Sequence, residues 1–366
     1  MINTSGGVYA QNPVISSGGV YAQNPGISSG SASAQSRSLI DRVPEDEFEL
    51  YRYHNEKEKR LPGFKDSDEV LAAKLIQLAY INETRAKSGV QPVRLDILAS
   101  RLANKMAAEA AIKNYAGHWN TAGEKPYHRW AFEGGLDHVS ENAAAMSTNG
   151  SFDVSPLGAV RMMREMYDEF MSEKPPDDGH RQTCIDRNHN YVGLGYFTSR
   201  YQFRYYEEYL DRYLNFYDVD NEVAVEEECR ISFKPRSGGS GSGEQASGGQ
   251  ASGEQASGRH ASGDQASGEL HVYALLAYWE PFPEPMTPRE ISRMGSYDDY
   301  TPDMGIAIWP WEIGSYLNGD RFEIPLIFPE EGLYYIHIYL DDREFSGTEA
   351  STIGKLQASG IVIRVK

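Results

Sequence analysis

Two histidines and two carboxylates within residues 118–180 are the side chains of this chain best suited to chemistry. They lie in four short fragments, Gly117-His118-Trp119, Ser140-Glu141-Asn142, Met166-Tyr167-Asp168-Glu169 and Gly179-His180-Arg181. Imidazole and carboxylate groups that leave coordination positions open can hold a divalent cation or form a proton-transfer pair. We therefore predict that these fragments, although they belong to separate helices and loops, meet in one site.

Each fragment also has an interpretation without chemistry. His118 can be a loop histidine bonded to the backbone, and Glu141 can favour the N-terminus of a helix through the helix dipole. We expect His128 and His138 to be surface or structural residues. We expect no nucleophile at Cys184, because no convincing base lies beside it in the sequence.

Size and charge restrict the class of protein. The chain has 366 residues, of which 40% are apolar, and this length predicts two domains. A net charge of −18 argues against nucleic acid or an anionic membrane as a partner.

No run of about 18 apolar residues occurs, so we expect no transmembrane helix. Cys184 and Cys229 are too few for a disulfide scaffold, and whether they pair stays open.

Two segments have a composition that cannot form a packed core. The sequence Ser-Gly-Gly-Val-Tyr-Ala-Gln-Asn-Pro occurs at 5–13 and again at 17–25, and we predict a disordered tail over residues 1–40. Ala-Ser-Gly recurs between 237 and 269, which predicts a second disordered stretch. A strand predicted upstream, at 229–234, makes that stretch an insertion within the second domain.

Residues 66–217 combine helices with strands. Apolar spacing predicts helices over 66–88, 97–111 and 156–171, the last capped by Ser155 before Pro156. Aromatic and apolar runs at 191–196 and 201–206 predict strands. This order of elements favours a layered α+β domain. Short alternating runs over 219–366 predict a small antiparallel β-sandwich as the second domain.

Several motifs between 117 and 196 resemble the CAP superfamily of cysteine-rich secretory proteins, antigen 5 and pathogenesis-related 1 proteins. The matching fragments are Gly117-His118-Trp119, Gly123-Glu124-Lys125-Pro126-Tyr127-His128-Arg129, Ser140-Glu141-Asn142, Gly179-His180-Arg181 and Val192-Gly193-Leu194-Gly195-Tyr196. The resemblance implies an α-β-α sandwich with a central His/Glu cavity, which zinc or another divalent ion occupies in some members. We expect Gly193 and Gly195 to permit tight packing of a strand.

Carried over to this sequence, the resemblance implies a metal-binding tetrad of His118, Glu141, Glu169 and His180. Zinc is the cation expected, and Glu165 is the rival to Glu169. On the predicted helix, Glu169 lies nearer the buried edge of the apolar stripe than Glu165, so we prefer Glu169. An acidic stretch that begins at Glu207 and Glu208 departs from the family pattern, and the sequence offers no purpose for it.

The resemblance favours a non-catalytic binding protein, with the tetrad for a cation and a groove for a small apolar ligand such as a sterol or fatty acid. One alternative is a metal-dependent, peptidase-like hydrolase that uses the same tetrad, although no His-Glu-x-x-His helix is present. Another is a structural or stress-response interaction protein. The family suggests an extracellular location, but no secretory signal is visible at the N-terminus, which leaves an intracellular one as the alternative.

Overall fold

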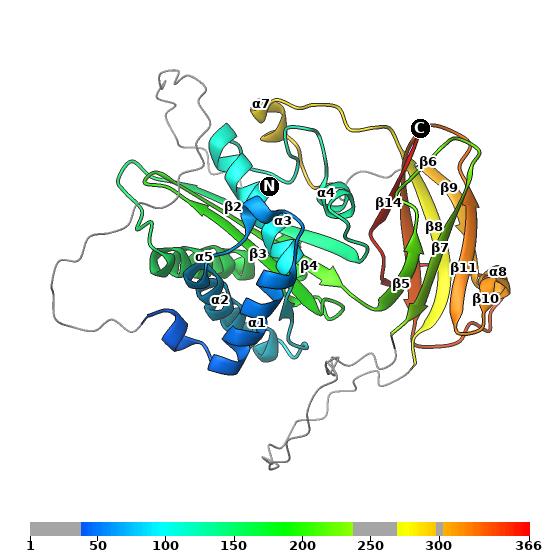
Figure 1. The fold of residues 1–366 in the computed structure, drawn as a ribbon, viewed down its shortest axis with the longest axis horizontal. Helices are drawn as coiled ribbons and strands as arrows, with labels where there is room; N and C mark the ends of the chain where they lie inside the picture. Colours follow the sequence, from blue (N-terminus) through cyan, green and yellow to red (C-terminus); the bar gives the residue numbers. More distant parts are fainter. Residues whose placement is uncertain (1–37, 237–268, 298–302) are drawn as a thin grey trace, which may run out of the picture.

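The structure is a computed structural model, and it describes residues 38–236, 269–297 and 303–366. Helices and sheets are combined in the α+β manner expected, with helical layers in the N-terminal half and two sheets in the C-terminal half (Figure 1). The predicted tail over 1–40 and insertion over 237–269 lie almost entirely outside the described residues. Both stay predictions.

A four-stranded sheet forms the middle of the N-terminal half. Its strands, in spatial order, are β1 (Arg94–Leu95), β3 (Tyr191–Thr198), β4 (Gln202–Asp211) and β2 (His138–Ser147). β1 pairs with β3 in parallel, and the other pairs are antiparallel. β2 is therefore an edge strand, and its register with β4 places Glu141 opposite Glu208 and Asn142 opposite Glu207.

Helices cover both faces of this sheet. One apolar core joins the sheet to α3 (Ile97–Lys113) and α4 (Pro126–Phe132), and another joins it to α2 (Asp68–Lys87), α5 (Pro156–Ser172) and α6 (Gly179–Ile185). The predicted helices correspond to α2, α3 and α5, and Ser155 caps α5 by accepting the backbone N–H of Gly158 at 3.1 Å. The strand β2 was missed, because an Ala-rich run does not show strand periodicity.

The glycines of β3 allow α3 to lie directly on the sheet. A Cβ atom on Gly193 would lie 2.4 Å from the backbone of Ala99, and one on Gly195 would lie 2.1 Å from the backbone of Ala103. A side chain at either position would push the helix away from the sheet. The expectation that these glycines permit tight packing is confirmed.

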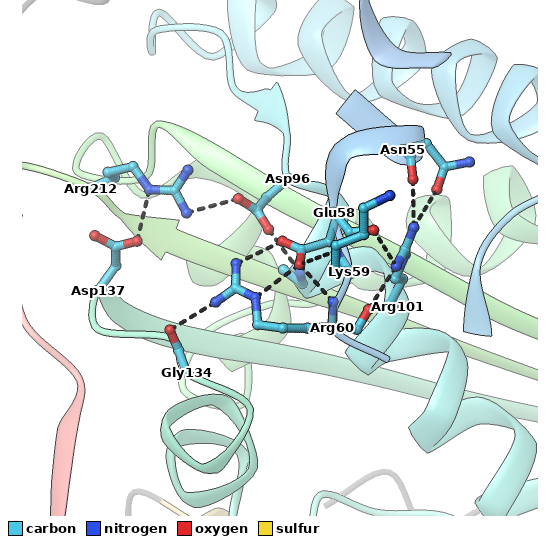
Figure 2. Close-up of polar contacts among 10 residues, drawn as sticks. Asn55, Glu58, Lys59, Arg60, Asp96, Arg101, Gly134, Asp137 and Arg212 are labelled. Carbon is cyan, nitrogen blue, oxygen red and sulfur yellow. Dashed lines mark hydrogen bonds and ion pairs between the residues drawn. The ribbon is translucent and has the colours of Figure 1, made fainter. Parts of the chain in front are cut away.

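A helix that the sequence analysis missed, α1 (Glu45–Lys57), precedes the layers and is followed by a polar network (Figure 2). The Arg101 guanidinium on α3 donates to the backbone carbonyls of Asn55, Glu58 and Arg60 at 2.6–3.1 Å. Arg60 in turn donates to the carbonyl of Gly134 at 3.0 Å. Side-chain cations thus satisfy the carbonyls of a segment that has little apolar surface to bury. Short 3-10 turns flank this segment at Ile40–Arg42 and Pro62–Phe64.

Two sheets make up the C-terminal half. The first consists of β10 (Leu317–Asn318), β11 (Arg321–Ile327), β7 (Glu228–Pro235) and β5 (Leu214–Val219). The second consists of β6 (Glu222–Val223), β14 (Ile361–Val365), β12 (Gly332–Asp341), β8 (His271–Glu280) and β9 (Asp303–Ile308), with β13 (Leu356–Gln357) paired to β12. Side chains from both sheets share one apolar core. β6 pairs with β14 in parallel, so these strands are not all antiparallel as predicted. Short helices lie at α7 (Pro288–Ile291), α8 (Pro310–Ile313) and the 3-10 turn Gly314–Tyr316.

The two halves meet across a polar cluster with little exposure to solvent. Lys125, the N-cap residue of α4, binds Glu280 at the end of β8 at 2.7 Å, and the Tyr127 hydroxyl donates to the same carboxylate at 2.5 Å. The ring of Tyr127 stacks on that of Tyr335 with centroids 4.2 Å apart. Residues 281–297, which we call the strap, then run from β8 back over the N-terminal half and include α7, drawn in yellow in Figure 1.

Both cysteines are buried and free, so Cys184 and Cys229 do not pair. None of the helices in the described ranges combines the length and the apolar character needed to cross a membrane.

The buried ion pair between Lys74 and Asp66, at 2.7 Å, supplies a test of how the N-terminal segment is held. Replacing Asp66 with alanine leaves the Lys74 ammonium buried without its carboxylate, which costs about 3–5 kcal/mol of unfolding free energy. We expect this loss in urea denaturation. As a control, Glu56→Ala breaks the exposed pair with Lys65 and should change stability by less than about 1 kcal/mol. Equal losses in the two variants would contradict this account.

Candidate functional site

His118 and Glu141 form the first half of the site. His118 lies in the loop between α3 and α4, and its Nδ1 lies 2.9 Å from Oε1 of Glu141 on β2. A carboxylate only accepts hydrogen bonds when ionised, so Nδ1 of the neutral ring carries the proton and Nε2 keeps a lone pair. Arg129 also holds the loop, because its guanidinium donates a hydrogen bond to the backbone carbonyl of His118 at 2.6 Å.

His180 and Glu173 form the second half. His180 lies in the first turn of α6, and its Nδ1 lies 2.6 Å from Oε1 of Glu173. The other oxygen of Glu173 accepts the backbone N–H groups of His180 at 3.0 Å and Arg181 at 3.3 Å. Glu173 therefore orients the ring and also satisfies the otherwise unpaired N–H groups at the start of α6.

The carboxylate beside His180 is thus Glu173. The metal-binding tetrad predicted from the sequence instead contains Glu169, with Glu165 as its rival. Both of those side chains lie on the exposed face of α5. Helical periodicity ranks residues only within the helix, and α5 ends at Ser172. Glu173 follows immediately, with φ −56° and ψ 151°, outside the helical region, and the chain then leads to α6.

The two histidines meet at the edge of the sheet. Their ring centroids lie 6.3 Å apart, with 29° between the planes. The side chain of His118 is 16% exposed and that of His180 is 35% exposed, so solvent reaches the pair mainly on the His180 side. Within the described ranges, no set of three or more His, Cys, Asp or Glu side chains is arranged to hold one ion. The site therefore consists of two imidazole rings, each of which is hydrogen-bonded through Nδ1 to its own carboxylate.

Glu141 is ionised although it is buried. Burial would raise the pKa of Glu141, but the Arg129 guanidinium, which binds Oε2, and His118 hold that pKa below its usual value. Glu208 lies opposite Glu141 in the β2–β4 register. Burial and the charge of Glu141 raise the pKa of Glu208 well above its usual value, so Glu208 is protonated. One carboxylate of this pair carries charge and the other does not.

A second polar cluster lies under α6. The side-chain amide of Asn142 donates to the carbonyl of His180 and to Oε2 of Glu207, both at 3.2 Å. Tyr205 donates its hydroxyl to Oε1 of Glu207 at 2.7 Å. Burial raises the pKa of Glu207 to about 7 and raises that of the Cys184 thiol well above its usual value. As expected, Cys184 has none of the character of a reactive thiolate. The acidic stretch at Glu207 therefore begins inside the core.

The other histidines of the motif region have different roles. His128 is buried, with Nε2 3.4 Å from Glu280, so it belongs to the junction between the two halves. His138 starts β2, and its Nε2 lies 3.4 Å from the hydroxyl of Ser140. The expectation of a structural role holds for His128, which is not at the surface.

Two shallow hollows have linings that include no histidine. One, of about 340 Å³, lies between the halves and is lined by Ala122, Glu124, Phe132, Phe282, Pro283, Pro285, Leu333, Arg364 and Lys366. The other, of about 350 Å³, lies on the strap and is lined by Glu284, Pro285, Met286, Glu290, Arg293 and Met294. The first has the more apolar lining, and the Arg364 guanidinium sits 3.7 Å from the centre of the Phe132 ring.

Comparison with known families gives one match, within the N-terminal half. The family model of the CAP, cysteine-rich secretory protein family, matches residues 78–209. No curated protein matches the chain. Among solved structures, an extracellular protein containing an SCP domain from Bacillus anthracis str. Ames is 15% identical, over 38% of this chain and 43% of that one, with a TM-score of 0.29.

Two further similar structures cover more of their own length. An outer surface protein from Borrelia burgdorferi is 13% identical, over 38% of this chain and 92% of that one, with a TM-score of 0.30. The CAP domain of enterococcal PrgA is 11% identical, over 48% of this chain and 83% of that one, with a TM-score of 0.28. Scores this low carry no argument about function.

The raised pKa of Glu207 predicts a pH dependence of stability. The unfolded chain releases this proton near the ordinary glutamate pKa of 4.5, whereas the folded chain holds it to about pH 7. The folded state thus binds more protons between these values, so its stability falls as pH rises from about 4.5 to about 7. The loss attributable to Glu207 is about 3 kcal/mol.

We expect Glu207→Gln to remove this pH-dependent part of the unfolding free energy. Relative to the variant, wild type should lose stability between about pH 4.5 and about pH 7 and lose no more above pH 7. Urea denaturation at a series of pH values measures the difference. The exposed Glu165→Gln serves as the control and should follow wild type. Parallel curves for wild type and Glu207→Gln would contradict the raised pKa.

Proposed function

The chain belongs to the CAP superfamily through residues 78–209, and from that premise we propose that it is a non-catalytic binding protein whose His118 and His180 hold a divalent cation. The observation that carries this proposal is the pairing of each ring with its own carboxylate. His118 Nδ1 meets Glu141 at 2.9 Å, and His180 Nδ1 meets Glu173 at 2.6 Å.

Histidines that bind metals commonly donate their second ring N–H to a carboxylate, which fixes the tautomer and raises the basicity of the free nitrogen. Both rings here meet that condition. We therefore assign the Nε2 atoms of His118 and His180 as the protein ligands, with water completing the shell. Glu141 and Glu173 then act as orienting partners and not as direct ligands. Imidazole donors suit zinc, which is the cation that we propose.

The hydrogen bonds of the two glutamates favour binding over hydrolysis. A hydrolase needs a carboxylate able to take a proton from a metal-bound water. Glu141 is engaged by His118 on one oxygen and by Arg129 on the other. Glu173 is engaged by the His180 ring and by two backbone N–H groups. Neither glutamate is arranged as a general base.

We also propose a small apolar acid, such as a fatty acid, as a second ligand, in the hollow between the halves. Its volume of about 340 Å³ lies at the lower end of the range for ligand pockets. Phe132, Phe282 and Leu333 supply apolar contact, and Arg364 supplies positive charge for a carboxylate. The ammonium of Lys366, which also lines the hollow, is paired with Glu222 at 2.7 Å. A sterol lacks that carboxylate, so a fatty acid fits the lining better.

The division of the chain belongs to the same proposal. We take residues 66–217 as the CAP-like domain and 219–366 as a β-sandwich domain that carries the 237–269 insertion. The shared core of the two C-terminal sheets supports the second unit. β5 begins at Leu214, however, so strands of the second unit start before residue 219.

The cation site is tested by stability and by titration. We expect zinc to stabilise the full chain by about 2.7 kcal/mol at one hundred times the Kd, seen as a higher Tm. The double variant His118→Ala/His180→Ala should lose this response. Glu173→Gln should weaken zinc binding by about 10- to 100-fold, because it removes the charge that orients His180.

Glu169→Gln provides a matched control, since Glu169 lies on α5, four residues before Glu173, and is exposed. Its zinc affinity should equal that of wild type in isothermal titration. Loss of affinity in Glu169→Gln but not in Glu173→Gln would restore the assignment made from sequence. If zinc does not change the Tm of the wild-type protein, the alternative of a structural or stress-response interaction protein is favoured.

Binding of a fluorescent fatty acid to the full chain tests the second ligand. We expect Arg364→Ala to weaken binding by about tenfold, because the charged partner of the ligand carboxylate is lost. Arg343→Ala removes an exposed arginine that does not line the hollow, and it should leave binding unchanged. Equal affinity in all three proteins would exclude Arg364 as the carboxylate partner.

A further inference from the structure

The strap that leaves the C-terminal sheets is held against the loop that carries His118. Its backbone N–H at Met286 donates to the carbonyl of Thr121 at 3.0 Å. Ile291, at the end of α7, is completely buried, and a Cβ on Gly117 would lie 3.4 Å from it. The strap therefore packs on the residue directly before His118, where Figure 1 draws α7 over the N-terminal half.

Tyr297, the last residue of the strap, contacts the histidine site. The hydroxyl of Tyr297 accepts the backbone N–H of Glu141 at 2.9 Å. Its ring meets the ring of His118 edge to face, with centroids 5.0 Å apart and 68° between the planes. The tyrosine is only 8% exposed. One side chain from outside the family match at 78–209 thus contacts two members of the site.

The edge position of β2 explains why such a contact matters. An edge strand presents backbone N–H groups that no neighbouring strand can accept. Tyr297 supplies the acceptor for one of them at Glu141, whose carboxylate orients His118. The same residue covers one side of the His118 ring. His180 stays more open, at 35% exposed against 16% for His118.

We propose that Tyr297 is a positioning residue of the cation site, so that the site in the N-terminal half is complete only with the strap docked. This inference rests on the proposed function. Tyr297 holds the Glu141 backbone and limits the motion of the His118 ring. It also covers one side of the His118 ring, so the His180 side is the more open approach to the site.

Two variants of the full chain separate the hydrogen bond from the shielding. Tyr297→Phe keeps the ring and loses the hydroxyl, so zinc affinity should fall about tenfold while His118 stays covered. Tyr297→Ala loses both, so zinc affinity should fall at least as far and His118 should become open to solvent. Met294→Ala alters an exposed strap residue and should change neither property.

Zinc affinity is measured by isothermal titration. Exposure of His118 is measured, without metal, by its rate of modification with diethylpyrocarbonate relative to His180, read by mass spectrometry. A general loss of structure would raise the rates at both histidines together. The proposed role predicts a selective increase at His118 in Tyr297→Ala and none in Tyr297→Phe.

Equal zinc affinity in wild type and Tyr297→Phe would overturn the positioning role and leave the proposed function intact. An unchanged His118 rate in Tyr297→Ala would overturn the shielding role. A wild type that binds no zinc would instead overturn the proposed function itself, and the inference with it.

Discussion

The buried ion pair between Arg129 and Glu141 is the interaction on which the histidine site depends. A carboxylate without exposed surface keeps its charge only if a cation lies beside it. Arg129 supplies that cation from α4, and it also binds the carbonyls of His118 and Glu124. One guanidinium therefore joins the loop, the short helix and β2. Glu208, without such contacts, is the carboxylate of the pair that takes up the proton.

The register of β2 with β4 extends this constraint to the second histidine. Neighbouring residues of a strand point to opposite faces of a sheet, so Glu141 and Asn142 act on different sides. Glu141 orients His118, while Asn142 binds the carbonyl of His180 and the carboxyl group of Glu207. Because β2 is an edge strand, elements from both faces can meet around it. A shift of β2 by one residue would turn Glu141 and Asn142 to the opposite faces of the sheet, so that Glu141 would no longer contact His118 and Asn142 would no longer contact His180.

Much of this arrangement was predictable from local patterns, and the remainder depends on contacts between distant segments. Spacing predicted α2, α3 and α5, and the motifs predicted His118, Glu141 and His180. Glu173 was missed because it acts just beyond a helix end, where periodicity carries no information. The burial of Glu207 was also missed, since charged residues are normally solvated and only the strand register places it inside. The helix α1 escaped prediction because polar bonds to Arg101, visible in Figure 2, hold its last turn and the residues that follow it.

The strap changes how the two halves relate to each other. It begins after Glu280, which is bonded to Lys125 and Tyr127, and it ends at Tyr297, which is bonded to Glu141. Both ends are therefore fixed to the N-terminal half, and Ile291 is buried between them. A strap held at two points cannot follow a rotation of the C-terminal sheets without breaking buried polar contacts, each of which is costly to leave unpaired. If the proposed cation binds His118, linkage requires that it also stabilise the docked strap, which contacts His118 and Glu141 through Tyr297.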